Sequence, residues 1–515
     1  MELLAFVLYF ALILGVGLFF FFRSKSGGEK EYFLGGRAMG PWVTAMSAQA
    51  SDMSGWLLMG FPGSILAFGM GKVWIGIGLA LGTAANWIFV AKRLRRFSRA
   101  SGDSITLPQY LTNRFASQSS VLKIVCAVIF LVSFTVYVSS AFVAGKNIMT
   151  AVIPELADSP MLAMAIFAVF ILLYTFLGGY KAVCWTDFFQ GILMLIALLA
   201  VPIIMATGSF DASFNGAFAD GITAFGTNPF AASWQDIVSG LAWGLGYFGM
   251  PHIIVRFMAI KKPSMVKKSA TVAIIWVVIT LGAAIAIAIL GRTFLLTDGT
   301  SLSALLLPAG AQQDIFITVV LDIFPAFIAG VLLAAIVAAA MSTADSQLLV
   351  ASSAFTSDIY KPIIRKNKTT DKEILWVGRI VVLIVAVVGF IIAASGINNA
   401  DSWANSIMSM VENAWGLFGA SFGPVVILSL FWRRFNYAGA CAGIITGAAV
   451  DIFWLLTCTN TIIKNPIIGV TGVYEVLPGF VAGLIAAVVV SLATKAPSAE
   501  VDAIFASATD ESIDD

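Results

Sequence analysis

Charged residues are scarce in this sequence, because Asp, Glu, Lys and Arg together make up 11% of 515 residues, against roughly a quarter in soluble proteins. Apolar residues make up 59%, and the mean hydropathy is +0.95. No polar stretch is long enough to fold as a separate soluble domain. The composition excludes an ordinary soluble protein, shows no footprint of nucleic-acid binding, and predicts an all-α integral membrane protein embedded in lipid.

Histidine and cysteine are also rare: the chain has one histidine, His252, and four cysteines. The cysteines lie in or beside apolar runs without CxxC spacing, which indicates small core residues rather than disulfides or metal ligands. Zinc-protease and paired-carboxylate spacings are missing, as is the GxxxxGK[ST] phosphate loop. The sequence therefore predicts no enzyme, no cofactor and no ATP-hydrolysing pump within this chain, so a gradient must supply the energy for any transport.

Long apolar runs dominate what is present. A transmembrane helix needs about 20 mostly apolar residues, and the first such run has neither a basic n-region nor a convincing cleavage site, so we expect it to be retained. By that measure the sequence predicts thirteen spans, near residues 3–22, 39–60, 66–91, 121–149, 160–178, 187–207, 233–257, 269–291, 314–345, 374–395, 404–431, 436–457 and 471–493.

The basic residues predict the orientation, because Lys and Arg collect in cytoplasmic loops. With the N-terminus outside, all but four of the 30 Lys and Arg residues fall on one face; the exceptions are Lys72, Lys146, Arg292 and Lys464. We therefore expect a multi-pass protein of the bacterial cell or inner membrane, with its N-terminus outside and its C-terminus in the cytoplasm. No obligate protein partner is inferred.

The span order predicts five segments. They are an accessory span and loop (1–38), a first five-helix repeat (39–207), a second five-helix repeat with its outer loop (208–431), two C-terminal spans (432–495) and a partly disordered cytoplasmic tail (496–515). An odd number of spans inverts one repeat relative to the other. Many secondary transporters have this plan, with the first helix of each repeat broken near the midplane.

The opening helix of each expected repeat contains helix-breaking residues. The first carries SAQASDMSG around Asp52, and the second carries SGLAWGLGYFGMP, with several glycines and Pro251. Glycine alone also serves close packing in membrane helices. Placing a charged carboxylate as deep in the membrane as Asp52 costs roughly 2.5–3.5 kcal/mol of insertion free energy. Asp52 therefore serves a sodium or proton site or holds the broken helix open. The alternative is a structural carboxylate that is paired across helices.

A second polar group lies in AAAMSTADSQ, residues 338–347, where Ala339, Ser342 and Thr343 share one helical face. Hydroxyl and carbonyl oxygens suit a hard cation, although Ser and Thr in membrane helices also bond their own i−4 carbonyl. Asp345 and Ser346 follow on the next turn, and with Asp187 they are candidates for a second cation site or a cytoplasmic gate. Glu412 and Asp451 are interpreted as hydrogen-bond partners inside the bundle, with a proton relay as the alternative, and His252 as a structural residue.

Aromatic residues accompany the expected breaks. They are Tyr137, Trp243, Tyr247 and Phe248. Such residues also serve as interfacial anchors or core, but beside glycine-interrupted helix they favour a pocket for a compact apolar ring or chain.

Six stretches resemble the sodium/solute symporter family, and within it the members that transport proline. They are YFLGGRAMGPWVTAMSA (32–48), ASDMSGWLLMG (50–60), YTFLGGYKAVCWTDFFQ (174–190), WGLGYFGMPHIIVRFMA (243–259), MSTADSQLLVASSAF (341–355) and FGASFGPVV (418–426). The resemblance, which extends from about residue 30 to 498, implies thirteen helices with two inverted five-helix repeats. It also implies sodium-coupled uptake of L-proline by alternating access, with another amino acid, a monocarboxylate or a sugar as the alternative solute.

The resemblance further implies roles for individual residues. Sodium would bind backbone carbonyls of Ala50, Met53 and Ala339 and the hydroxyls of Ser342 and Thr343, with Asp52 in support. Proline would contact Ser54, Gly55, Tyr137, Trp243, Tyr247 and Pro251. Arg37 would belong to the inner gate, and Asp187 to the cytoplasmic ion pathway. The chain departs from the family pattern at Asp345 and at Glu412-Asn413, which leaves the number of bound cations open.

Overall fold

The computed structural model describes residues 1–23, 28–177, 179–207, 228–297, 311–399, 402–458 and 471–510. Within these ranges the chain forms helices and no strand, apart from one isolated bridge between Met39 and Ile260. The prediction of an all-α membrane protein is therefore confirmed. Most of the expected outer loop at 208–232, Lys464 and the end of the tail lie outside the described residues.

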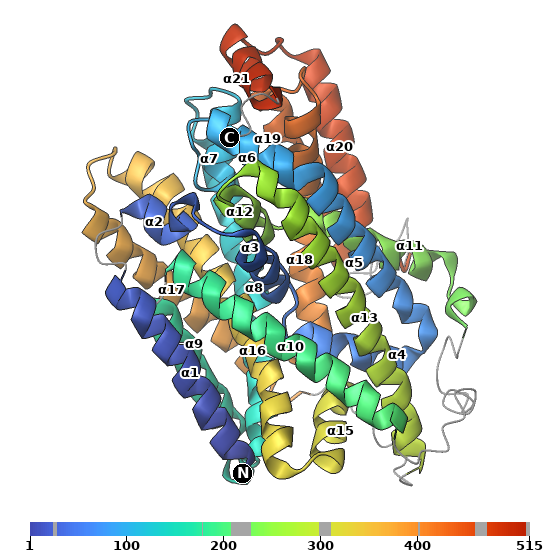
Figure 1. Ribbon diagram of the computed structural model, residues 1–515. Coiled ribbons are helices and arrows are strands. Elements are labelled where there is room, and N and C mark those ends of the chain that lie inside the picture. Colours follow the sequence, from blue (N-terminus) through green and yellow to red (C-terminus); the bar gives the residue numbers. More distant parts are fainter. Residues whose placement is uncertain are drawn as a thin grey trace.

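The helices of the first half follow the expected order (Figure 1). Their bounds are α1 Glu2–Arg23, α2 Glu29–Leu34, η1 Gly35–Arg37, α3 Pro41–Asp52, η2 Trp56–Gly60, α4 Phe61–Phe68, η3 Met70–Lys72, α5 Val73–Ala85, η4 Asn86–Ala91, α6 Lys92–Ala100, α7 Leu107–Arg114, α8 Val121–Val152, η5 Pro154–Leu156, α9 Pro160–Leu177 and α10 Tyr180–Thr207.

The second half continues in the same way. Its helices are η7 Pro229–Ala231, α11 Trp234–Ala242, η8 Trp243–Phe248, α12 Pro251–Ala259, η9 Pro263–Met265, α13 Val266–Thr297, η10 Ala311–Asp314, α15 Ile315–Ile323, α16 Ala326–Phe355, η11 Thr356–Ile364, α17 Asp371–Ser395, η12 Trp403–Asn405, α18 Ile407–Phe431, α19 Tyr437–Thr457, α20 Val476–Ala493 and α21 Ala499–Thr509.

Among the described residues, 10 helices are long and apolar enough to cross a membrane, or 11 if α11 and α12, bent by 43°, form one span. Two further predicted spans correspond to shorter apolar helices, Trp56–Phe68 after the break in the first opening helix and Pro160–Phe176 within α9. The count of thirteen spans and the division into two five-helix repeats therefore stay predictions.

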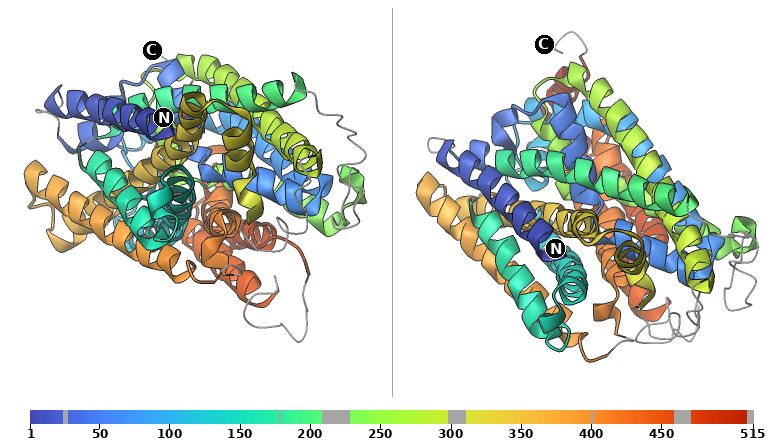
Figure 2. Two further views of the ribbon diagram at one scale, coloured as in Figure 1. Left: turned by 90° about the horizontal axis from the view of Figure 1, so that it is seen from below. Right: turned by 60° about the horizontal axis from the view of Figure 1, so that its bottom comes forward.

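Two helices form the centre of the bundle. α16 packs against α8, α10 and α3 and is buried along most of its length, and α18 is buried to a similar degree. The alanine-rich run before Ser342 allows this close approach, because small residues let helix backbones come together in lipid. In the further views α1 lies at one edge of the bundle, with α19 and α20 away from it (Figure 2).

Glycines bring α5 against α11 and η8. A Cβ added at Gly78 would lie 2.3 Å from the carbonyl oxygen of Gly240, and one added at Gly82 would lie 2.4 Å from that of Gly244. At these positions backbone packs directly on backbone, so any larger residue would collide with main-chain atoms that cannot rotate away.

The structure corrects two predicted boundaries. Asp187 does not open a helix, because α10 already begins at Tyr180 and places the carboxylate two turns inside. The tail is also more ordered than predicted: α21 forms after a Ser498 cap and packs against α6, with Phe505 edge-on to Phe97. Tertiary packing, which the tail's acidic composition does not reveal, stabilises this helix.

Candidate functional site

The first opening helix breaks where the sequence predicts. α3 ends at Asp52, Met53 leaves helical geometry with ψ of 75°, and helix resumes at Trp56. Across the break, the backbone N–H of Ser54 donates to the carbonyl of Asp52 at 3.0 Å. A Cβ at Gly55 would come within 2.9 Å of the Ala144 side chain, so glycine lets the break lie directly against α8.

Aromatic side chains satisfy the polar groups that the break exposes. The Trp56 indole N–H donates to the Asp52 carbonyl at 3.1 Å, and the Tyr137 hydroxyl reaches the same oxygen at 3.4 Å. The Tyr247 hydroxyl donates to the Asp52 carboxylate at 2.5 Å. Non-helical backbone at membrane depth is stable only when buried in protein or lining a cavity. Asp52 thus fastens the broken α3 to η8, the irregular part of the second broken helix.

The oxygens expected at the sodium site converge between α3 and α16. The Ser342 hydroxyl donates to the carbonyl of Ala50 at 2.7 Å and is 3.2 Å from the carbonyl of Ala339. Thr343 lies beside it, 1% exposed, and its buried hydroxyl has no hydrogen-bond partner. A buried hydroxyl without a partner carries a free-energy penalty, which a bound cation would remove.

No group of three or more His, Cys, Asp or Glu side chains in the described ranges is arranged to hold a metal ion. The donors gathered here are instead neutral hydroxyls and carbonyls, a set that suits a hard monovalent cation. Met53 lies at the break beside this group. The arrangement brings Ala50, Ala339 and Ser342 into contact, and the sodium roles of all five residues stay predictions.

The residues expected to bind substrate divide into two groups. Ser54, Gly55, Tyr137 and Tyr247 are buried at the break, and Pro251 opens α12, which follows η8 along the chain. Trp243 instead lines a separate cavity of about 880 Å³ between the break and the end of the bundle that bears the N-terminus. There its ring lies tilted against that of Tyr474, with ring centroids 5.2 Å apart.

Three carboxylates, on α18, on α19 and at the N-cap of α20, lie at or near this cavity. Glu412 and Glu475 line it, and Asp451 is 1% exposed with no partner for either oxygen. A Cβ at Gly416 would lie 3.1 Å from an Asp451 oxygen and 3.4 Å from a Glu475 oxygen. From the sequence, Glu412 and Asp451 are interpreted as hydrogen-bond partners inside the bundle, with a proton relay as the alternative. For Asp451 the hydrogen-bond interpretation is wrong among the described residues, since its carboxylate has no hydrogen-bond partner.

Asp187, Asp345 and Ser346 form a different polar cluster that includes Arg256 of α12. The Arg256 guanidinium lies 3.1 Å from the Asp187 carboxylate and 2.5 Å from the Ser346 hydroxyl. It is 1% exposed and also donates to Ser47. The positive charge in contact with Asp187 here is therefore an arginine side chain, and a cation bound to this carboxylate would compete with it.

Arg37 closes the opposite end of the bundle from the N-terminus. Its guanidinium donates to the carbonyls of Met258 and Ser104 and pairs with Asp103 at 2.8 Å. Burial lowers the pKa of Arg37, and the Asp103 charge opposes that effect. Hydrogen bonds from Lys30 and the nearby Arg37 charge outweigh partial burial, so the pKa of Asp103 lies below its ordinary value of 3.8. These contacts tie η1 to α12 and to the turn after α6, and the gate role of Arg37 stays a prediction.

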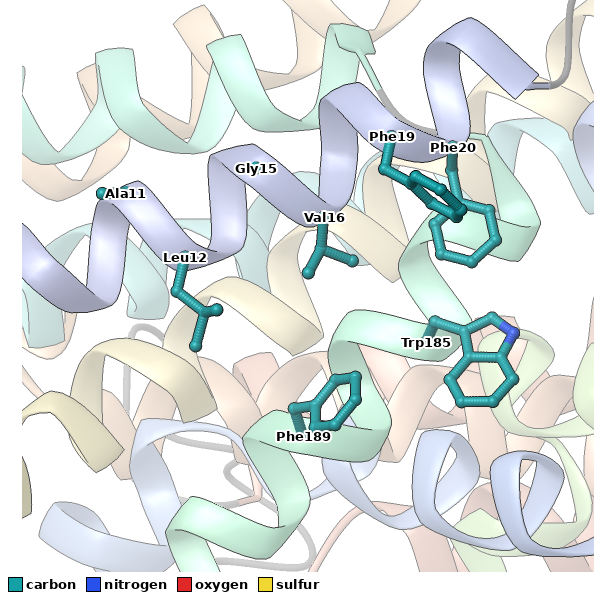
Figure 3. A pocket seen from close by; sticks show the side chains of 8 residues that line it. All are labelled: Ala11, Leu12, Gly15, Val16, Phe19, Phe20, Trp185 and Phe189. Carbon is teal, nitrogen blue, oxygen red and sulfur yellow. The ribbon is translucent and has the colours of Figure 1, made fainter.

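A groove between α1 and α10 has a different character. It holds about 700 Å³, and Figure 3 shows side chains of α1 facing Trp185 and Phe189 of α10. Leu12, Phe19 and Phe189 are about half exposed. Its lining is almost wholly apolar, so it suits lipid chains rather than a zwitterionic solute.

Sequence reasoning missed three residues that the structure brings to these sites. They are Trp56, Glu475 and Arg256. Arg256 was counted with the cytoplasmic basic residues because it precedes a basic loop. Its position inside the apolar run PHIIVRFMA was the available signal, because an ionisable residue within a span marks a functional contact by default. Glu475 carried the same signal, because it lies within the predicted span 471–493. Trp56 gave no comparable signal.

The model of the sodium:solute symporter family matches residues 32–447 of the chain. Sodium/proline symporters of Staphylococcus aureus, including those of strains JH9 and NCTC 8325, are 41% identical over 500 residues, covering 96% of this chain and 93% of theirs.

Solved structures share the fold. A sodium-coupled sialic acid symporter in a substrate-bound, outward-open state has a TM-score of 0.75 at 20% identity, covering 96% of this chain and 98% of its own. MhsT in complex with L-phenylalanine has a TM-score of 0.55 at 14% identity, covering 87% and 97%. On the family match and the near-complete overlap with the curated relatives, the chain belongs to the sodium:solute symporter family.

Proposed function

We propose that this protein couples the inward movement of sodium to the uptake of L-proline. The observation that carries the proposal is the break in α3, which faces the Ser342 and Thr343 hydroxyls and leaves one of them without a partner. The 41% identity to sodium/proline symporters supports proline as the solute. The protein acts as a transporter in the membrane, with the N-terminus outside and the C-terminus in the cytoplasm.

The mechanism follows from what joins α3 to α16. Sodium enters from the outer side and binds the oxygens of Ala50, Ala339, Ser342 and Thr343, with the Met53 carbonyl completing the set. Its charge replaces the direct hydrogen bond between Ser342 and Ala50 and fixes the geometry of the break. Ser54 and Gly55 then receive the solute, because the N-terminus of a half-helix that follows a break points the positive end of its dipole at an anionic substrate group.

The ring of proline lies against aromatic side chains. Tyr137 and Tyr247 are held by Asp52, and Trp243 stands between the outer cavity and the break. Pro251 completes this wall from α12. A compact apolar ring with a zwitterionic head therefore finds an apolar wall beside polar backbone.

Release to the cytoplasm requires Arg37 to part from Met258 and Ser104. Asp187 and Ser346 lie next to Arg256 on the cytoplasmic side of the sodium site, where they form the ion pathway, and Asp345 adds a second acid there. Because coupling is reciprocal, sodium tightens proline binding by the factor with which proline tightens sodium binding. One sodium with zwitterionic proline carries one charge inward, about 2.3 kcal/mol per 100 mV.

Uptake of radiolabelled proline into proteoliposomes tests the proposal. We expect uptake that requires an inward sodium gradient and that rises when the lumen is made negative. A competition panel of unlabelled proline, hydrophobic amino acids, acetate and sugars reports the solute. Uptake indifferent to both sodium and membrane potential would refute the mechanism, and preferential competition by another solute would reassign the substrate while keeping the coupling.

A further inference from the structure

A cavity of about 660 Å³ lies between α2, η1 and α6, at the end of the bundle opposite the N-terminus. It is lined by four basic side chains, one acid and one glycine, namely Lys30, Arg37, Arg95, Arg99, Asp103 and Gly102. The four positive charges face a single carboxylate. We propose that this cavity, called here the basic cavity, binds the phosphate group of an anionic ligand.

The basic cavity holds more positive than negative charge. Four other basic residues on this face each pair with an acid: Lys181 with Glu31, Lys361 with Glu29, Arg365 with Glu373 and Arg433 with Asp502. In the basic cavity, Asp103 pairs with both Lys30 and Arg37. The excess of Lys and Arg in cytoplasmic loops accounts for basic residues on this face. It does not account for four of them around one carboxylate.

One buried nitrogen points to a missing partner. Arg95 is 4% exposed, and it donates to the carbonyls of Ile260 and Lys261 at 2.7 and 3.2 Å. Its remaining terminal nitrogen, Nη1, is buried without a hydrogen-bond partner. A buried, charged donor left unpaired is costly, and a phosphate oxygen would satisfy it. Guanidinium groups bind phosphate with two parallel hydrogen bonds, which makes arginine a preferred phosphate ligand.

The position of the basic cavity gives such an anion a structural effect. Lys30 and Arg37 precede the broken helix α3, whereas Arg95 and Arg99 belong to α6. A phosphate between them would neutralise their mutual repulsion and link these two segments. Because Arg37 also contacts Met258 of α12, the bound anion would stabilise the closed arrangement at this end of the bundle.

Phosphate can come from an anionic phospholipid or from solution, and two binding assays on the purified full-length protein separate the sources. The first is native mass spectrometry in detergent with dioleoylphosphatidylglycerol or dioleoylphosphatidylcholine. The second measures thermal unfolding with inorganic phosphate against chloride at equal ionic strength. The test variant combines Lys30→Gln with Arg99→Gln. Its matched control combines Arg365→Gln with Arg433→Gln, which removes the same charge from the same face.

We expect the parent and the control to retain the phosphatidylglycerol molecule, or to gain stability in phosphate, and the test variant to lose about tenfold in that affinity. Retention selective for phosphatidylglycerol identifies lipid as the source, and stabilisation by free phosphate identifies the soluble anion. A conservative variant, Lys30→Arg with Arg99→Lys, should restore binding. Equal behaviour of the parent and the test variant in both assays, or equal loss in the control, would overturn the proposal. Neither assay depends on transport.

Discussion

Removing the Thr343 hydroxyl should separate sodium binding from folding. Thr343 is buried at the expected sodium site and its hydroxyl has no partner, so Thr343→Val keeps the side-chain shape while removing one ion ligand. Without sodium the variant should be no less stable than the parent. It can gain up to about 1–3 kcal/mol, the penalty of a buried unsatisfied polar group.

Sodium affinity should change in the opposite direction, because Thr343→Val removes a ligand of the ion. A hydroxyl that interacts with a charged group contributes about 1.5–3 kcal/mol, and each 1.4 kcal/mol is a factor of ten in affinity. The sodium concentration for half-maximal proline uptake should therefore rise roughly ten- to hundredfold. At saturating sodium the half-saturation constant for proline should stay close to that of the parent.

Two measurements check this reasoning. Initial uptake rates across a series of sodium concentrations give the sodium requirement, and thermal unfolding in sodium or potassium gives ion-specific stabilisation. Thr175→Val is a suitable control, because that buried hydroxyl bonds its own helix at the Ile171 carbonyl, 2.7 Å away on α9. An unchanged sodium requirement in Thr343→Val, or the same shift in the control, would refute the assigned site.

Three further predictions concern the substrate wall, the glycine interface and the gate. Trp243→Ala should raise the half-saturation constant for proline by about tenfold, because it removes a large apolar contact, and should change the sodium dependence less. Uptake kinetics measure both constants, and a defect confined to sodium dependence would argue against this role. Gly82→Ala should lower the thermal unfolding temperature, because overpacking costs about 1–3 kcal/mol or more of stability. Gly282→Ala, where a Cβ meets nothing within 4 Å, should not lower it. Equal unfolding temperatures for the two variants would contradict the close contact at Gly82. The Asp103 pair with Arg37 has a depressed carboxyl pKa, so its stabilisation is present above the ordinary value of 3.8 and is lost as pH falls below it. Comparing parent and Asp103→Asn unfolding temperatures should give a constant difference from about pH 5 upward that closes in acid, and a difference that grows in acid would be inconsistent with this pair.

The break at Met53 could be predicted because its causes are local. A carboxylate among Ser, Gly and Ala in an apolar run cannot be explained by lipid-facing packing, and the i, i+3 and i+4 positions of Ala339, Ser342 and Thr343 fix a shared helical face. The hydrogen bond between Ser342 and Ala50 agrees with that interpretation. Periodicity and one deep charge indicated the two polar groups separately, and the resemblance to the symporter family implied that they face each other.

What could not be predicted depends on contacts between distant segments. Arg256 and Asp187 are 69 residues apart, and no pattern in either helix indicates that they pair. Glu475 reaches Asp451 only because α19 and α20 pack closely. α21 is helical because it packs against α6. In each case the signal lies in the tertiary arrangement, which a single sequence leaves open.

The glycine contacts between α5 and the second broken helix restrict how this protein can move. Side-chain interfaces can slide by changing rotamers, but Gly78 and Gly82 meet Gly240 and Gly244 through main-chain atoms that have no rotamers to exchange. We therefore expect α5 and the second broken helix to move together as one rigid body during a conformational change. Any bending between the two sides of the membrane should then occur at the interrupted turns, at Met53 and around Gly249.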